Sequence, residues 1–228
     1  WIAVILTLVM GLVVGMIHAF LINEFNLSPF VVTFASLFIL QGISLTITTK
    51  PIGRASRDFL MLYSQKFLGV PIIVYYFIFI TLLIMFLLRK TVFGKHIYAI
   101  GGNLSVAQLS GIPVKRVRYG VYGLCSVLAA STGLLWLMRM GVGDPVIGKE
   151  LELNAIIAVV IGGTSLFGGR GTVTGVLGGI LLLTFTDNLL VVLGVSQFIS
   201  GLIKGIIFVV AVALYKQADR ARGGFSGP

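Results

Sequence analysis

Apolar residues along this chain come in long continuous runs, not in stripes that recur at every third or fourth position. A run of about 20 apolar residues can cross a bilayer as a helix, and a helix satisfies its own backbone hydrogen bonds in lipid. The pattern therefore predicts an all-α, polytopic transmembrane bundle of about seven helices. The runs are 1–22, 30–48, 70–88, 119–138, 151–167, 173–193 and 198–215.

The segments between these runs indicate a single transmembrane domain over 1–228. Neither an internal repeat nor a low-complexity linker divides the chain. The fifth run is short and ends in glycines, which predicts a tilted or broken helix. Trp1 lies inside an apolar run without a preceding Met or charged leader, so we expect the polypeptide to extend further toward its N-terminus.

Basic residues outnumber acidic ones and gather between the third and fourth runs. The chain has 17 Lys and Arg against 7 Asp and Glu, a net charge of +10. In a soluble protein this excess suggests nucleic-acid binding, whereas in a membrane protein it is typical of cytoplasmic loops. We therefore expect no nucleic-acid partner, a cytoplasmic loop at about 89–118, and external loops at 49–69 and 139–150. The basic residues of the cytoplasmic loop are Arg89, Lys90, Lys95, Lys115, Arg116 and Arg118.

No set of side chains in the sequence matches a known catalytic or metal-binding pattern. His18 and His96 each lack a second ligand at suitable spacing, and Cys125 is the single cysteine. The glycine-rich stretch 163–171 lacks the Lys-Ser/Thr ending of a phosphate-binding loop. Its glycines are expected instead to allow a tight reversal or a close approach of helices. We predict no enzyme activity, no metal and no cofactor bound by this chain.

Ionisable and polar residues inside the apolar runs form a candidate pathway or gate. Asp187 and Lys204 lie at nearly equal distances from the turn that joins the last two runs, so both reach a similar depth. We predict an ion pair between them, because isolated charges in a bilayer are costly. The alternative is that each side chain reaches the interface separately. The other members are Asn154, Thr164 and Asn188, which hydrogen bonds between helices would explain equally well.

Glycines spaced four residues apart occur at three places in the chain. This spacing lets two helix backbones approach closely within a bilayer. We expect close helix packing at each place, and the alternative is an interface that moves as a gate. The pairs are Gly11 and Gly15, Gly171 and Gly175, and Gly201 and Gly205.

A polar stretch at 101–118 interrupts the apolar runs and predicts a short helix at the membrane surface. The Asn103 side chain is suited to cap this helix, Gly111 to end it, and Pro113 to prevent its continuation. Such a helix could transmit the motion of a soluble motor into the bundle, and the alternative is an amphipathic surface anchor. Its expected apolar contacts are those of Leu104, Ala107 and Leu109.

Three motifs together give the chain a resemblance to a known family. They are Tyr98–Asn103 (YAIGGN), Leu109–Ile112 (LSGI) and Glu152–Leu166 (ELNAIIAVVIGGTSL). With them the chain resembles the ribose-type sugar permeases, which are membrane subunits of bacterial ABC importers. The wider family includes the branched-chain amino-acid permeases. Supporting matches are 28–33, 168–171, 193–196 and 204–205.

The resemblance implies a permease of the bacterial inner membrane that translocates a monosaccharide or a related small polar solute. It implies cytoplasmic ATP-binding subunits that hold ATP and Mg²⁺, a periplasmic solute-binding protein, and a second permease subunit, identical or different. We expect the binding protein to dock on loops 49–69 and 139–150. Loop 49–69 is expected to be an ordered turn or a short helix, and the alternative is a solvated connector. The resemblance makes the surface helix a coupling helix with Asn103, Leu104, Ala107, Gln108, Leu109 and Gly111.

The chain departs from the family pattern at several positions. Ser105-Val106-Ala107 replaces a usual Glu-Ala-Ala, and Gln108 replaces a frequent basic residue, which favours apolar over charged docking. Asp187 and His18 each replace a usual Asn, and Gln41 replaces a frequent Arg. These last three changes either tune the choice of substrate or have no effect.

Two other classes of function compete with this interpretation. A branched-chain amino-acid permease is the nearest one. An autonomous channel or ion-coupled secondary transporter would need midplane ionisable residues or inverted repeats, and the sequence shows neither clearly. Uptake without an ATPase would distinguish the autonomous transporter. A membrane enzyme is disfavoured, because the sequence has no paired acid and base.

Overall fold

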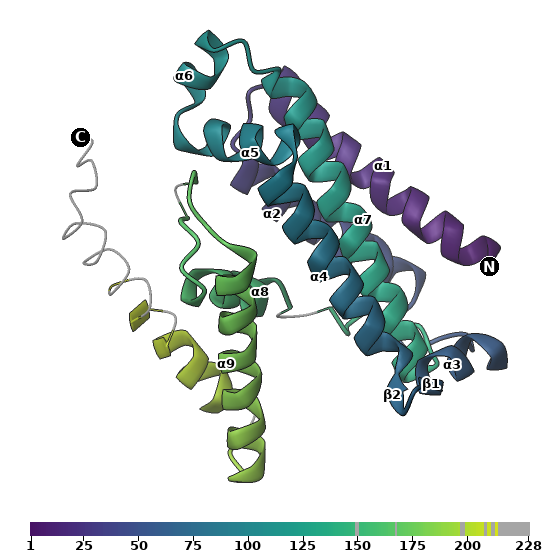
Figure 1. Cartoon of the computed structure of the whole chain (residues 1–228). Coiled ribbons are helices and arrows are strands. Elements are labelled where there is room, and N and C mark those ends of the chain that lie inside the picture. Colours follow the sequence, from purple (N-terminus) through teal and green to yellow (C-terminus); the bar gives the residue numbers. More distant parts are fainter. Residues whose placement is uncertain (149–150, 167, 197–198, 208, 211–212, 214–228) are drawn as a thin grey trace. The chain divides into compact units, whose positions relative to one another are not determined.

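The computed structural model describes residues 1–148, 151–166, 168–196, 199–207, 209–210 and 213, and it is predominantly helical (Figure 1). In chain order the elements are α1 (Ile2–Glu24), α2 (Pro29–Ile47), α3 (Arg57–Ser64), β1 (Lys66–Phe67), β2 (Val70–Pro71), α4 (Ile72–Lys90), α5 (Val92–Gly102), α6 (Leu104–Leu109), α7 (Val114–Met140), α8 (Leu151–Ile161) and α9 (Val173–Val192). Residues 199–207 are helical as well.

Five of the described helices are long and apolar enough to cross a membrane, namely α1, α2, α4, α7 and α9. They contain between 19 and 27 residues. At about 1.5 Å per residue such helices match a hydrocarbon core of about 30 Å. The prediction of an all-α, polytopic membrane protein is confirmed.

Three of the predicted runs have different limits in the structure or are only partly described. The helix in the run 151–167 is shorter than the run, because α8 ends at Ile161 and a turn with Gly163 at φ +79° follows, in line with the broken helix that its glycines predicted. α7 begins at Val114 instead of 119, because Pro113 suits a helix start, where no backbone donor is needed. In the run 198–215, residues 199–207 are helical, and residue 198 and several later positions lie outside the described residues.

Contacts within the chain define two compact units, each described by itself. The first unit comprises 1–96 and 105–148. The second unit comprises 97–104 and the described residues from 151 onward. The division falls inside α5, so this helix begins in the first unit and ends in the second.

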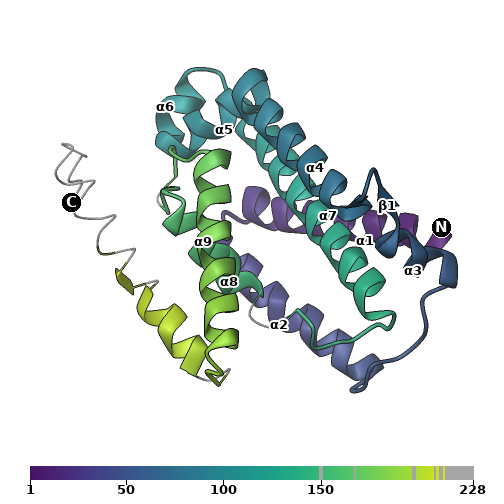
Figure 2. The same ribbon diagram turned by 60° about the horizontal axis from the view of Figure 1, so that its bottom comes forward.

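In the first unit, α7 runs alongside α1 and α4 in both views (Figures 1 and 2). A Cβ atom built on Gly11 would lie 2.7 Å from the Cβ of Ala130, and one on Gly15 would lie 2.5 Å from the Tyr122 carbonyl oxygen. No residue other than glycine fits so close an approach without a shift of the backbone. The predicted close packing at Gly11 and Gly15 is confirmed.

The loop 49–69 contains a short helix and a hairpin in the first unit, so of the alternatives considered for this loop the ordered one is observed. Ser56 Oγ accepts a hydrogen bond from the Phe59 amide at 3.4 Å and caps α3, and β1 and β2 form a short antiparallel hairpin. The backbones of Ile52 and Gly143 exchange hydrogen bonds of 2.9 and 3.0 Å. The two loops that were expected on one side of the membrane are therefore joined to each other.

In the second unit, α8 packs closely against α9 through glycine. A Cβ on Gly162 would lie 2.6 Å from the Gly175 carbonyl oxygen, and Gly179 approaches the backbone of Ala158. Ile157, Ala158 and Leu183 form the buried core of this pair. The expectation of close packing is thus confirmed at Gly175.

The pair Gly201 and Gly205 behaves differently. Among the described residues, no atom lies within 4 Å of a Cβ built on either glycine. The expected close packing at this pair is therefore wrong within the part of the chain that the structure describes. The four-residue spacing allows an approach between helices, but it does not supply the second helix.

Candidate functional site

The segment expected to meet a soluble motor begins at a sharp corner between α4 and α5. Thr91 Oγ1 donates a hydrogen bond to the Leu87 carbonyl at 2.6 Å and accepts one from the Gly94 amide at 3.2 Å. A side chain at Gly94 would meet the carbonyl oxygens of Leu87 and Leu88. Glycine at this position therefore lets α5 turn away from α4.

The short helix predicted in the polar stretch is α6. It is preceded by Asn103, which lies outside both neighbouring helices, and followed by Gly111 at φ +77°. Leu109 is 89% exposed, whereas Ala107 is 2% exposed. Ala107 therefore belongs to the protein interior, and the remaining residues of the set, on α6 and at its two ends, are exposed. These are Asn103, Leu104, Gln108, Leu109 and Gly111.

The end of α5 is fixed against the turn that joins α8 to α9. The Tyr98 hydroxyl donates a hydrogen bond to the Gly171 carbonyl at 2.9 Å. A Cβ on Gly101 would lie 2.5 Å from the amide nitrogen of Gly169, and one on Gly168 would lie 2.6 Å from the Gly101 carbonyl oxygen. The prediction for this stretch was a tight reversal or a close approach of helices, and its glycines at 168 and 169 bring the turn close to the end of α5.

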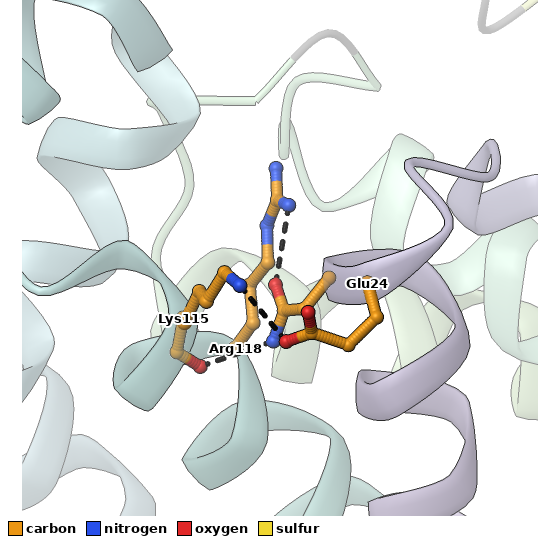
Figure 3. A network of polar contacts seen from close by, with 4 residues as sticks. Glu24, Lys115 and Arg118 are labelled. Carbon is orange, nitrogen blue, oxygen red and sulfur yellow. Dashed lines mark hydrogen bonds and ion pairs between the residues drawn. The ribbon is translucent and has the colours of Figure 1, made fainter.

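Polar groups join the end of α1 to the beginning of α7 (Figure 3). Glu24 Oε1 lies 2.8 Å from Lys115 Nζ. Arg118 Nη1 donates to Asn23 Oδ1, and Asn23 Nδ2 donates to the Lys115 carbonyl, both at 3.3 Å. Because Asn23 is only 5% exposed, its amide needs these partners. Two of the basic residues assigned to the cytoplasmic loop therefore have a structural role.

The predicted ion pair between Asp187 and Lys204 is present in the second unit. Asp187 Oδ1 lies 2.9 Å from Lys204 Nζ, and the two side chains are 41% and 18% exposed. The two side chains attract each other by opposite charge. They do not form a directed hydrogen bond, because the buried Asp187 Oδ1 accepts none from the described residues. The aspartate is therefore held mainly by the lysine charge.

The other polar candidates separate into different environments. Asn154 and Lys204 line a common cavity. Asn188 donates to the Thr184 carbonyl of its own helix at 2.9 Å and is exposed. Thr164 Oγ1 is buried without a hydrogen-bond partner among the described residues. Lys204 therefore shares a cavity wall with Asn154 and an ion pair with Asp187, whereas Thr164 and Asn188 do not line that cavity.

The unusual residues at 18 and 41 both have contacts in the first unit. The His18 ring meets the Tyr122 ring edge-on at 6.4 Å between centroids. Gln41 Nε2 donates to the Pro145 carbonyl at 3.1 Å, which ties α2 to the loop after α7. No group of three metal-ligating side chains occurs among the described residues.

Sequence reasoning did not identify Tyr98 and Gly101 as contacts of the turn at 168–171. Both lie in the motif 98–103, but their partners are some seventy residues away, at separations that no local pattern reports. It also missed Asn23, whose position at the end of an apolar run, next to Glu24, was an available indication of a polar contact at the helix end.

Residues 1–212 match the family described as "Branched-chain amino acid transport system / permease component". The chain is 41% identical over 189 residues to a probable ABC transporter permease, YphD, of Escherichia coli strain K12, which covers 82% of this chain and 57% of the relative. It is 39% identical over 200 residues to the ribose import permease RbsC of Bacillus subtilis strain 168, and the match covers 86% of this chain and 62% of the relative.

A third relative is the L-arabinose ABC transporter permease AraH of Azospirillum brasilense. It is 35% identical over 211 residues, which cover 92% of this chain and 62% of the relative. The chain thus spans about three-fifths of the length of these curated relatives, between 57% and 62%. No solved structure matches it.

Proposed function

The chain belongs to the family of branched-chain amino-acid transport permease components, and we propose that it is the membrane-spanning permease subunit of a bacterial ABC importer for a monosaccharide or a related small polar solute. The sugar assignment is supported by relatives named for ribose and L-arabinose. In this proposal 1–228 forms one transmembrane domain in the inner membrane, and the solute crosses it without chemical change.

The observation that carries the proposal is the position of α6 in the chain. This six-residue helix has an exposed apolar side chain, Leu109, and directly follows the segment that contacts the turn between α8 and α9. A soluble subunit that moved α6 would therefore pull on the second unit through Tyr98 and Gly101. This is the arrangement that a coupling helix needs, and the loss of charge at 105–108 makes the docking surface apolar.

The partners in this proposal are cytoplasmic ATP-binding subunits, which hold ATP and Mg²⁺, a periplasmic solute-binding protein and a second permease subunit. The joined loops at 49–69 and 139–148 would form the platform for the binding protein, because backbone hydrogen bonds hold them together. Asn154, Thr164, Asp187, Asn188 and Lys204 would lie along the solute pathway or its gate.

The test is co-purification of the ATP-binding subunit with the full-length permease. Leu109→Glu places a charge at an exposed position of α6 and should release the ATP-binding subunit while the permease stays folded. Leu68→Glu is the matched control, since Leu68 is 85% exposed in the β1–β2 hairpin. It should retain the ATP-binding subunit and weaken only the solute-binding protein. Retention by both variants would contradict the coupling assignment.

The family description favours a second candidate, a branched-chain amino-acid permease. Vesicles that hold the complete transporter separate the two by their uptake of ribose, arabinose or leucine. Uptake that persists without the ATP-binding subunit would instead show an autonomous carrier.

A further inference from the structure

One cavity in the second unit has polar groups in an otherwise apolar wall. Its volume is about 290 Å³. Small-molecule sites usually occupy roughly 300–1,000 Å³, so the space suits a small solute. Its lining residues are Leu153, Asn154, Ile156, Ile157, Gly201, Lys204 and Gly205.

The polar groups of this cavity keep capacity for further hydrogen bonds. The Asn154 side chain makes no hydrogen bond to any residue that the structure describes. The Lys204 ammonium group has three N–H donors. Its contact with Asp187 Oδ1, at 2.9 Å, leaves donors for a solute. The aspartate also cancels the lysine charge. The cavity therefore offers donors and an acceptor with no net charge.

We infer that this cavity is a subsite of the solute pathway that takes an uncharged polyhydroxy solute, with Asn154 and Lys204 as its hydrogen-bonding residues and Asp187 as a positioning residue. The inference rests on the proposed function. Hydroxyl groups donate and accept hydrogen bonds, as an amide does, and the C–H groups of the solute would contact the aliphatic wall. Asp187 does not line the cavity, so the ammonium group of a zwitterionic solute would find no opposite charge in the cavity wall.

Two glycines keep this space open. No described atom lies within 4 Å of a Cβ built on Gly201 or Gly205, so a larger side chain at either would enter the cavity without a collision. Gly178 on α9 has equally open surroundings and does not line the cavity. It therefore provides a matched control for the same substitution.

The first experiment compares Gly205→Leu with Gly178→Leu in the full-length permease, reconstituted with its ATP-binding subunit and solute-binding protein. Uptake of radiolabelled ribose and arabinose is measured. We expect Gly205→Leu to lower uptake about tenfold or more, because it fills the subsite, and Gly178→Leu to stay within about twofold of wild type. Equal uptake by the two variants would overturn the subsite and leave the proposed function intact. Wild-type vesicles that take up neither sugar would overturn both.

A second experiment measures occupancy directly and does not depend on the folding of Gly205→Leu. Gly201→Cys, in a Cys125→Ser background, is labelled with a water-soluble thiol reagent in the assembled complex. We expect ribose or arabinose at saturating concentration to slow labelling several-fold and leucine to leave the rate unchanged. Protection by leucine, or by none of the three, would overturn the assignment to an uncharged polyhydroxy solute.

Discussion

The helix pairs α1–α7 and α8–α9 use the same packing device in different surroundings. In both, glycine brings two backbones into direct contact, at Gly15 beside Tyr122 and at Gly179 beside Ala158. The α1–α7 contact ends in a polar network that ties the two helices together at Asn23. The α8–α9 contact lies in a unit that also has an ion pair and a cavity, and no described atom lies within 4 Å of a Cβ built on Gly201 or Gly205 in the cavity wall. The first unit also has an ion pair and a cavity, but that cavity is lined mainly by apolar side chains. The cavity of the second unit has Asn154 and Lys204 in its wall.

We infer from this difference that the first unit is a rigid frame and that the second unit contains the proposed solute pathway. The first unit has helices joined along their lengths and at their ends, as suits a part that holds its shape. A motor that acts on α6 would act on a helix that lies almost entirely in the first unit and, through the preceding end of α5, on the second unit with its cavity. Substitutions at the glycines, at the charged pairs and at the tyrosine hydroxyls test whether the two units differ in this way.

The largest effect is expected at the glycine contacts that both units share. Gly15→Leu and Gly179→Leu should each destabilise the protein by about 3 kcal/mol or more, because the new side chain meets backbone atoms that cannot move aside. A Cβ built on Gly42 of α2 has no described atom within 4 Å, so Gly42→Leu should leave the stability nearly unchanged. Thermal unfolding in detergent measures all three. A neutral Gly15→Leu would show that the α1–α7 contact is not part of a rigid frame.

Charge reversals should have a smaller effect on stability, and this effect should differ between the ion pairs of the two units. Asp187→Lys or Lys204→Asp should each cost about 1–3 kcal/mol, and the double reversal should restore most of the loss. The matching reversals at Glu24 and Lys115 should cost less than about 1 kcal/mol, because those side chains are 43% and 63% exposed. Assembly and unfolding temperature are compared in each cycle. A double reversal no better than either single variant would disprove the pairing of Asp187 with Lys204.

Part of this picture could be predicted from the sequence because lipid imposes strong local rules. Length and apolarity predicted the five long helices, turn chemistry predicted α6, and equal depth predicted the pair of Asp187 and Lys204. The same rules failed where the outcome depends on a neighbour. Gly11 with Gly15 and Gly201 with Gly205 have identical spacing, yet among the described residues only the first pair meets a second helix. Likewise, the motif at 98–103 contains no indication that its partner is the turn at 168–171.

The smallest structural change with a distinct functional consequence is the removal of one hydroxyl group. Tyr98→Phe deletes the hydrogen bond to the Gly171 carbonyl in the second unit, and Tyr76→Phe deletes a bond of 2.8 Å to Ser131 Oγ in the first unit. Each should lower stability by a similar amount, about 1 kcal/mol, because each removes one partly buried hydrogen bond.

Their effects on transport should differ. Tyr98→Phe should keep the ATP-binding subunit and its ATP hydrolysis but lower solute uptake per ATP several-fold, since the link from α5 to the turn at 168–171 is loosened. Tyr76→Phe should leave that ratio unchanged, because α4 and α7 are not on this link. The ratio of uptake to hydrolysis in reconstituted vesicles is therefore the informative measurement. If both variants lower it equally, motion reaches the pathway through the frame as well, and the two units do not have separate roles.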